Sequence, residues 1–282
     1  MIDILLCSSS GFSGHNIIKE MAKFKNYNLA ATYRKKKNQI KFKNVKLIKQ
    51  DLRQSFKFKF SPQYIIVCAN SHKIEDFEND ENYNFRNNIL IARKVSQYAK
   101  KTTKPILIYF STVDISYNNY PVNKKTYINS KIESEKIFKT YLKKNFFNKT
   151  IFLRLPAILG KKCNKNFLSN TKRRLKLNKD ISLWNSKSKY NNFIHISDVT
   201  RLINHIIKNN QKYKKNSIIN CLTSKPLSTH QTITYMKKKM NSHSKIILKD
   251  NFSDKLKLRK EANIKKFNFL TNIKTIDLFL KD

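Results

Sequence analysis

The sequence predicts an α/β fold in which a doubly wound, parallel β-sheet is followed by a smaller C-terminal lobe. In the first half of the 282-residue chain, short apolar segments alternate with amphipathic ones, as strands of a parallel sheet alternate with covering helices. The segment QYIIVCAN is apolar almost throughout, which is typical of a strand buried on both faces. Two of the chain's three glycines stand three residues apart directly after the first apolar segment. A strand, a glycine turn and a helix in this order indicate a Rossmann-type sheet.

Each element follows from the spacing of its apolar residues. In the first expected helix, Ile17, Ile18, Met21 and Ala22 fall on one face, which would pack against the sheet. The expected strands are IDILLC, YNLAATY, VKLIKQ, QYIIVCAN, PILIYFST and TIFLRLP. The expected helices between them are HNIIKEMAKF, FRNNILIARKVSQYAKK and SKIESEKIFKTYLKK.

The regular alternation loosens after residue 160, which predicts a change of domain there. We expect residues 1–160 to form the sheet domain and residues 161–282 to form most of the smaller lobe. A helix around residues 197–209, with Ser197 as its N-cap, is expected to return to the sheet domain. Trp184 is expected to be a packing anchor of the lobe.

The formal net charge of +41 has two interpretations. A basic protein can bind nucleic acid or another polyanion by neutralising phosphates. Alternatively, a coding bias toward lysine, asparagine and isoleucine raises the charge without function. Lysine is dispersed over all expected elements and arginine is scarce, although arginine suits bidentate phosphate contacts better. We therefore favour bias and expect no nucleic-acid partner.

Two further function classes are not expected. No run of eighteen apolar residues exists, so we expect no membrane span. The four cysteines are scattered, without the spacing of a metal site or a disulfide framework. We expect no metal, and a reducing cytoplasm as the location.

The glycine pair predicts a phosphate site. Glycine alone reaches positive φ without strain and lets a ligand approach the backbone closely. Gly11 and Gly14 stand directly before the first expected helix. The N-terminus of that helix could bind a pyrophosphate. The alternative is a strand–helix turn that needs glycine for packing alone.

Tyr127 and Lys131 form a candidate catalytic pair, because residues four apart share a helix face. A nearby ammonium lowers the pKa of a phenol and makes proton exchange possible. The spacing alone is uninformative, since the sequence contains four Tyr-x-x-x-Lys pairs. Only Tyr127 follows the strand that ends in Ser111 and Thr112 and reads Tyr-x-x-Ser-Lys. Doubly wound sheets place their sites at such carboxyl ends.

Several blocks together resemble one family. CSSSGFSG, KQDL, IIVCAN, YFSTVDIS, YINSK, LRLPAILG, NFIHISDV and NCLTSKPLS follow one another along the chain. In this order they resemble the extended short-chain dehydrogenases/reductases of the NAD-dependent epimerase/dehydratase group. The resemblance implies an NAD(P)-binding Rossmann domain, a substrate-binding lobe and a nucleotide-sugar substrate.

The resemblance also implies roles for individual residues. Thr112, Tyr127 and Lys131 would be the catalytic residues, with Tyr127 moving a proton and Lys131 lowering the pKa of Tyr127. His195 is expected to be a packed residue rather than a base. The residues expected to contact the cofactor are Ser8, Gly11, Phe12, Ser13, Gly14, Arg34, Asp51, Leu52, Ala69, Asn70, Tyr127, Lys131 and Pro156.

The chain departs from the family pattern at several positions. Ser8 replaces the first glycine of the loop. Val113 follows Thr112 where dehydratases carry an acidic pair, which disfavours a dehydratase. Asn191 and Asn192 stand where many members place a diphosphate-binding arginine, so Lys187 or Lys189 is expected to substitute.

Cofactor choice depends on the end of the second strand. An acidic residue there binds the ribose diol of NAD, whereas an arginine accommodates the 2′-phosphate of NADP. Residues 28–50 contain no acidic residue, and Arg34 follows the strand. We expect NADP, with NAD as the alternative.

The sequence therefore predicts an NAD(P)-dependent oxidoreductase or epimerase acting on a carbohydrate-like substrate, a nucleotide sugar in polysaccharide biosynthesis. The alternative is a catalytically silent sensor or scaffold that binds a dinucleotide and a polyanion. A homodimer is expected by analogy with the family.

Overall fold

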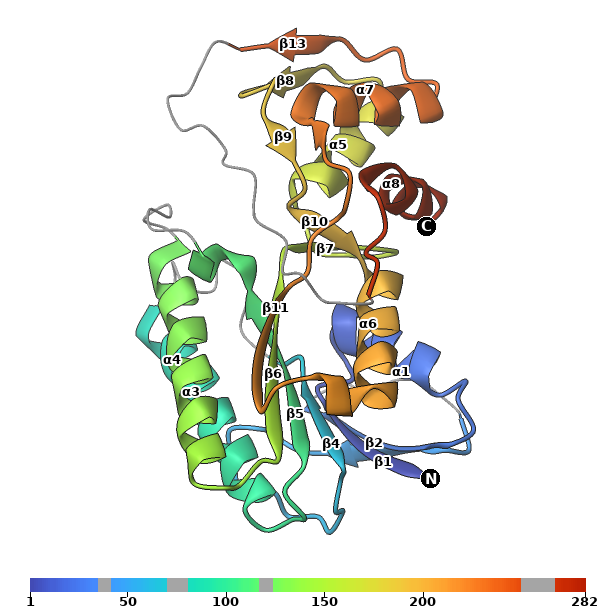
Figure 1. Ribbon diagram of the computed structural model, residues 1–282. Helices are drawn as coiled ribbons and strands as arrows, with labels where there is room; N and C mark the ends of the chain where they lie inside the picture. The colour runs from blue at the N-terminus through green and yellow to red at the C-terminus, as the bar shows by residue number, and fades with distance from the viewer. Residues whose placement is uncertain (35–41, 70–80, 117–123, 250–266) are drawn as a thin grey trace. The chain divides into compact units, whose positions relative to one another are not determined.

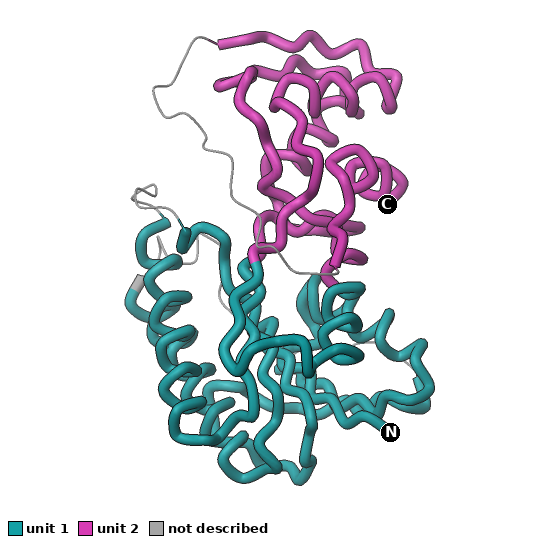
Figure 2. The backbone as a smooth tube through the Cα atoms, in the orientation of Figure 1, with its two compact units in different colours: residues 1–154, 200–219 teal, residues 155–199, 220–282 magenta. Residues whose placement is uncertain are grey.

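The computed structural model describes residues 1–34, 42–69, 81–116, 124–249 and 267–282. The chain divides into two compact units (Figure 2). Unit 1 contains residues 1–154 and 200–219, and unit 2 contains residues 155–199 and 220–282. These units follow from the packing of the backbone. The expected division of labour, with a cofactor domain to residue 160 and a substrate lobe after it, stays a prediction.

Unit 1 is built on a seven-stranded sheet with the order β11-β6-β5-β4-β1-β2-β3 (Figure 1). The strands are β1 (Ile2–Cys7), β2 (Tyr27–Tyr33), β3 (Val45–Lys49), β4 (Tyr64–Val67), β5 (Ile106–Thr112), β6 (Lys149–Leu155) and β11 (Asn216–Asn220). The pairs from β3 to β5 are parallel. The strand order reverses between β1 and β4, and ligands of Rossmann-type sheets bind at such a reversal. The doubly wound sheet predicted from the sequence is confirmed.

Helices cover both faces of the sheet. Helices α3 (Glu81–Ala99) and α4 (Lys125–Lys143) lie side by side over one face, and α1 (Phe12–Met21) lies over the other (Figure 1). Every residue of β4 and of β5 is buried. The apolar core under α3 and α4 includes Leu107, Phe138 and Phe152. Burying both faces explains why these strands have nearly continuous apolar sequences.

Helix α6 (Ile196–Lys208) begins one residue earlier than its sequence predicted. Ser197 is therefore not the N-cap but a residue of the first turn. Its hydroxyl lies 2.7 Å from His195 Nδ1, while His195 Nε2 contacts Asp282 Oδ2 at 2.9 Å. These contacts, with 6% exposure, agree with the expected packing role of His195.

Unit 2 contains three two-stranded sheets, β7 with β10, β9 with β12 and β8 with β13. Its strands are β7 (Ala157–Leu159), β8 (Ile181–Leu183), β9 (Lys189–Tyr190), β10 (Phe193–His195), β12 (Leu227–Ser228) and β13 (Ile246–Leu248). Its helices, besides the start of α6, are α5 (Phe167–Lys176), α7 (Thr229–Lys239) and α8 (Asn272–Lys281). Asn166 and Ser228 start α5 and α7 with capping boxes.

The core of unit 2 excludes its tryptophan. Leu159, Phe193, Ile233 and Phe279 are buried there, whereas Trp184 is 47% exposed. The expectation that Trp184 anchors the packing of the lobe is wrong. It follows β8 directly, and the preceding Leu183 takes the buried position instead.

Candidate active site

The loop after β1 is attached to the end of β2. The Ser8 backbone N–H donates to Thr32 Oγ1 at 2.9 Å, and the Ser9 N–H donates to the Thr32 carbonyl at 2.7 Å. Ser8 has a φ of 79°, in the region that favours glycine. Hydrogen bonds to β2 therefore hold a serine in a strained conformation at the position of the missing first glycine.

Gly14 is required by packing. A Cβ at this position would lie 1.8 Å from the Ser8 carbonyl oxygen and 3.2 Å from Cys68 Sγ. Only glycine permits this approach between α1 and the loop. For this glycine the alternative interpretation, that packing alone demands it, is sufficient.

Gly11 differs, because neither backbone nor packing demands glycine there. Its φ of −79° and ψ of 165° are open to any residue, and the nearest described atom to a Cβ would be Ser8 Oγ at 3.9 Å. Gly11 is the N-cap residue of α1 and supplies no side-chain cap. An open backbone at an uncapped helix N-terminus fits the pyrophosphate of a dinucleotide. Phe12 and Ser13 form the partly exposed first turn.

Cys68 connects this loop with the end of β4. Its thiol donates to the carbonyls of Cys7 at 3.1 Å and Ser8 at 3.3 Å. Ala69 follows and is 9% exposed. The remaining residue expected here, Asn70, lies outside the described residues.

Thr112, Tyr127 and Lys131 come together at the carboxyl end of β5. The Thr112 hydroxyl hydrogen-bonds to the Tyr127 side chain, and it contacts Asp114 Oδ2 at 3.1 Å. Lys131 Nζ donates to the Phe110 carbonyl at 2.9 Å and lies 5.7 Å from the centre of the Tyr127 ring. The ammonium thus lies over the ring.

The electrostatics of this pair differ from expectation. Burial, and then the nearby Asp114 carboxylate, raise the pKa of Tyr127, and the hydrogen bond from Thr112 opposes them. Burial lowers the pKa of Lys131 to about 7, against the raising effects of Glu135 and Cys68. Burial disfavours the charged form of each group, and the expected lowering by Lys131 is not among the causes that shift the pKa of Tyr127.

Two supporting residues were missed from the sequence. Asn88 on α3 is fully buried and donates to Ser130 Oγ at 3.0 Å. Ser130 in turn donates to the Tyr127 carbonyl at 2.7 Å. Glu135, one turn beyond Lys131, is also buried. An asparagine and a glutamate are common on helices, so no local signal distinguishes them.

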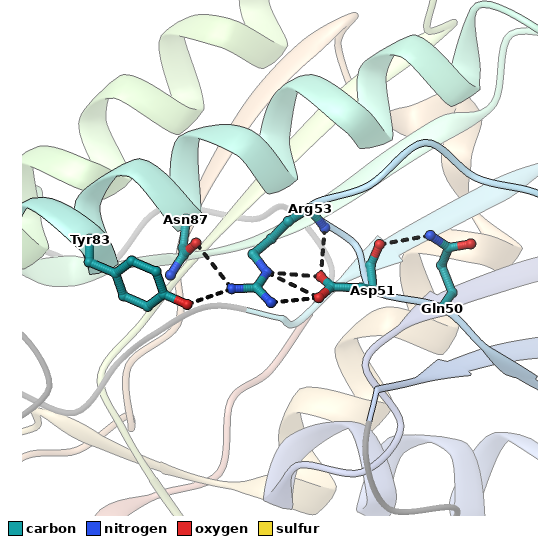
Figure 3. Close-up of polar contacts among 5 residues, drawn as sticks. All are labelled: Gln50, Asp51, Arg53, Tyr83 and Asn87. Carbon is teal, nitrogen blue, oxygen red and sulfur yellow. Dashed lines mark hydrogen bonds and ion pairs between the residues drawn. The ribbon is translucent and has the colours of Figure 1, made fainter.

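Asp51 does not stand free at the end of β3. Its carboxylate binds Arg53 through Nε at 3.0 Å and Nη2 at 2.6 Å (Figure 3). Arg53 Nη1 also contacts the Tyr83 hydroxyl at 2.8 Å and Asn87 Oδ1 at 3.4 Å. These contacts link β3 to α3. The hydrogen bonds from Arg53, with the charge of Arg34, lower the pKa of Asp51.

The other expected cofactor residues have different environments. Arg34 is exposed directly after β2, and its charge acts on Asp51. Leu52 is 7% exposed and belongs to the core under α3. Its expected contact with the cofactor stays a prediction. Pro156 belongs to unit 2, between β6 and β7.

Unit 2 has a hollow of its own beside α7. Lys187 and Lys189 line it together with Ser186, Ser228 and His230. Asn191 is buried; it stands at the position where we expected many family members to have an arginine. The two lysines expected to substitute for that arginine therefore do face one hollow.

Within the described ranges, no three histidine, cysteine or acidic side chains gather as a metal site would require. None of the helices described there is long and apolar enough to cross a bilayer.

The sequence profile of the NAD dependent epimerase/dehydratase family matches residues 4–221, which is most of the chain. The chain belongs to this family. By family it is an NAD(P)-dependent enzyme of the short-chain dehydrogenase/reductase type, as the sequence motifs indicated. No curated protein matches the sequence of this chain.

Solved structures with the same fold include several epimerases. The UDP-N-acetylglucosamine 4-epimerase of Methanobrevibacter ruminantium, in complex with UDP-N-acetylmuramic acid, has a TM-score of 0.82 at 14% identity and covers 100% of this chain and 98% of its own. The UDP-glucose 4-epimerase of Thermotoga maritima, with UDP-glucose, has a TM-score of 0.79 at 12% identity, with coverages of 99% and 98%. A UDP-glucuronic acid 4-epimerase variant of Bacillus cereus, with NAD and a fluorinated substrate analogue, has a TM-score of 0.78 at 13% identity, with coverages of 99% and 98%. At these identities the likeness establishes the fold of this family member.

Proposed function

We propose that the chain is an NAD(P)-dependent epimerase of nucleotide sugars. The observation that carries the proposal is the meeting of Thr112, Tyr127 and Lys131 at the end of β5. The glycine loop belongs to the same unit, and the thiol of Cys68, directly after β4, donates to the Ser8 carbonyl of that loop. The similar solved structures named as UDP-sugar 4-epimerases support this substrate class.

The proposed mechanism assigns one task to each residue. When bound, the dinucleotide supplies a hydride acceptor and donor at its nicotinamide carbon. Tyr127 takes a proton from a sugar hydroxyl. It returns the proton after the sugar has rotated and presents its other face to the dinucleotide. Thr112 hydrogen-bonds the same oxygen and orients it. Lys131 stabilises the phenolate that forms on Tyr127 in each cycle.

The raised pKa of Tyr127 has a consequence for this mechanism. Burial keeps the proton on the Tyr127 phenol at neutral pH, so the phenol must first release this proton to solvent before Tyr127 can accept one from the sugar. Proton transfer therefore requires Lys131 to be charged and close to the phenol oxygen. Movement of the ammonium from the Phe110 carbonyl would meet that requirement.

We propose NADP as the preferred dinucleotide. Arg34 follows β2 and is close enough to Asp51 to lower its pKa, so its charge faces the expected adenosine end. No acidic residue stands between β2 and Asp51. The Bacillus cereus structure contains NAD, which makes NAD the competing choice. Replacing Arg34 with serine should weaken NADPH binding about tenfold and leave NADH binding unchanged.

We propose that the hollow beside α7 receives an anionic part of the substrate. Lys187 and Lys189 line it and His230 adds a third nitrogen group. Nucleotide sugars carry a diphosphate, which two lysines can neutralise.

The deciding experiment combines cofactor titration with a conversion assay. NADPH and NADH fluorescence titrations measure affinity, and proton NMR follows UDP-glucose, UDP-N-acetylglucosamine and UDP-glucuronic acid for conversion to their 4-epimers. Conversion that Tyr127→Phe abolishes, while cofactor binding is unchanged, supports the proposal. Binding without conversion of any sugar favours the silent sensor, and absence of binding refutes both.

We also propose a homodimer in the cytoplasm. Helix α3 exposes Tyr83 and Leu90, which lie two turns apart on one side and could pack against a second copy. All four cysteines lie in the described residues and none of them forms a disulfide, as in a reducing compartment. Light scattering at micromolar concentration should give twice the mass of one chain.

A further inference from the structure

A buried carboxylate lies one helical turn beyond Lys131 and has no part in the mechanism above. Glu135 is 3% exposed and is held from three elements. Ser111 Oγ on β5 donates to it at 2.6 Å. Arg154 on β6 donates through Nε at 3.1 Å and Nη2 at 3.0 Å. Lys139 on α4 lies at 3.8 Å.

Glu135 is linked to the catalytic residues through the chain on both sides of its contact with Ser111. Ser111 directly precedes Thr112 on β5, and Lys131 is one turn before Glu135 on α4. The bond from Ser111 to Glu135 therefore joins the strand that carries the catalytic hydroxyl to the helix that carries the tyrosine and the lysine.

We propose that Glu135 is a positioning residue for the reaction: it aligns β5 with α4 through Ser111, and it places a negative charge one helical turn from Lys131. This inference rests on the proposed function, because Lys131 matters only if the proton relay operates. A purely structural ion pair with Arg154 is the competing explanation, since buried pairs add little net stability yet are costly to break.

The surroundings of Glu135 support an effect on charge. Glu135 raises the pKa of Lys131 against the effect of burial. It also helps to raise the pKa of Tyr109, a second group of the same buried region. Arg154 from β6 and Lys139 from α4 are the opposing cations. Cys68, after β4, is the remaining titratable group that acts on Lys131.

Glu135→Gln tests the charge, because glutamine keeps the size and can still accept from Ser111. The matched control is Glu133→Gln on the same helix, where the side chain is 41% exposed and pairs only with Lys136 among the ion pairs described. NADPH affinity and epimerisation rate are measured from pH 5.5 to 9.5. In Glu135→Gln the alkaline midpoint of both profiles should fall by about one unit, the usual effect of an opposite charge nearby. The control should match the wild type.

Ser111→Ala tests the alignment, because it leaves the ion pair intact. The epimerisation rate should fall about tenfold while NADPH affinity and the alkaline midpoint stay unchanged. A rate equal to that of the wild type overturns the alignment role. An alkaline midpoint that stays in place in folded Glu135→Gln overturns the charge role.

Two further measurements keep the outcome decisive. If Glu135→Gln does not fold, Glu135→Asp retains the charge and must keep the wild-type midpoint; a shift there overturns the inference. Wild-type protein that binds no dinucleotide at any pH refutes the proposed function itself, and the inference falls with it. Wild-type turnover combined with variants that behave identically refutes only the role of Glu135.

Discussion

At the scale of single residues, the two glycines of the first loop have different reasons to be glycine. Gly14 has no room for a methyl group because of the Ser8 carbonyl, whereas Gly11 has room and an ordinary backbone. In a chain with three glycines, the loop thus combines one packing requirement with one position left open for a ligand.

Replacing each glycine with alanine should separate these roles. Gly14→Ala should lower the free energy of unfolding by about 3 kcal/mol, the upper range for overpacking. Gly11→Ala should leave it unchanged or raise it by about 0.5 kcal/mol, yet weaken NADPH binding at least tenfold. Urea unfolding and fluorescence titration measure the two effects. If Gly11→Ala and Gly14→Ala were equally stable and lost NADPH binding equally, the two glycines would not have the different roles described here.

Lys131 should make stability depend on pH. Burial lowers its pKa to about 7 from 10.5, so the unfolded chain holds this proton more tightly than the folded protein. The contribution of Lys131 to stability therefore rises with pH between about 7 and 10.5 and is least favourable below pH 7. Lys131→Met removes it.

The measurement is the difference in unfolding free energy between Lys131→Met and wild type at pH 6, 8 and 9.5. We expect the variant to be the more stable protein at pH 6 and its advantage to shrink as the pH rises. Taking the difference removes the contributions of other groups. An advantage that is constant over this range would show that Lys131 is not titrating in the folded protein.

At the scale of elements, the site depends on how α3 and α4 pack together. Asn88 on α3 reaches Ser130, which bonds to the Tyr127 carbonyl. Arg53 connects the end of β3 to the first turns of α3 in the same way (Figure 3). Helix α3, which carries none of the expected catalytic residues, therefore supports both the tyrosine and the expected adenosine end.

Asn88→Ala should reduce the free energy of unfolding by about 2 kcal/mol, because it removes a buried hydrogen bond. The epimerisation rate should fall as well, since the turn that carries Tyr127 loses its support. Asn82→Ala, at an exposed position of α3, is the control and should behave as the wild type. Thermal unfolding and the conversion assay are compared for the three proteins; equal behaviour of Asn88→Ala and Asn82→Ala would contradict the support role.

At the scale of the whole molecule, the excess of positive charge is not concentrated in one unit. In the described parts of both units, lysine and arginine far outnumber aspartate and glutamate. Several of these lysines serve local structure: Lys149 donates to two backbone carbonyls and Lys172 to another. This distribution agrees with compositional bias.

The charge should still produce weak, salt-sensitive attraction to polyanions. Duplex DNA should be retained at 20 mM salt and released at about 150 mM, because non-specific binding depends on counterion release. NADPH binding should change much less over the same range, because the contacts proposed for the glycine loop are made by uncharged backbone groups. Gel-shift assays and fluorescence titrations check this prediction. DNA binding that persists at 150 mM salt would revive the polyanion interpretation.

The sequence by itself determined the order of strands and helices, the parallel sheet, the family and the three candidate catalytic residues. These features depend on local periodicity and on motifs whose residues are close in the chain. Tertiary structure decided the rest: that Gly14 but not Gly11 is demanded by packing, that Trp184 is exposed, and that Arg53 binds Asp51. It also decided that burial sets the pKa values of Tyr127 and Lys131, and that Glu135 connects their helix to β5. Burial and contacts between distant residues arise only when elements pack, so no spacing along the chain encodes them.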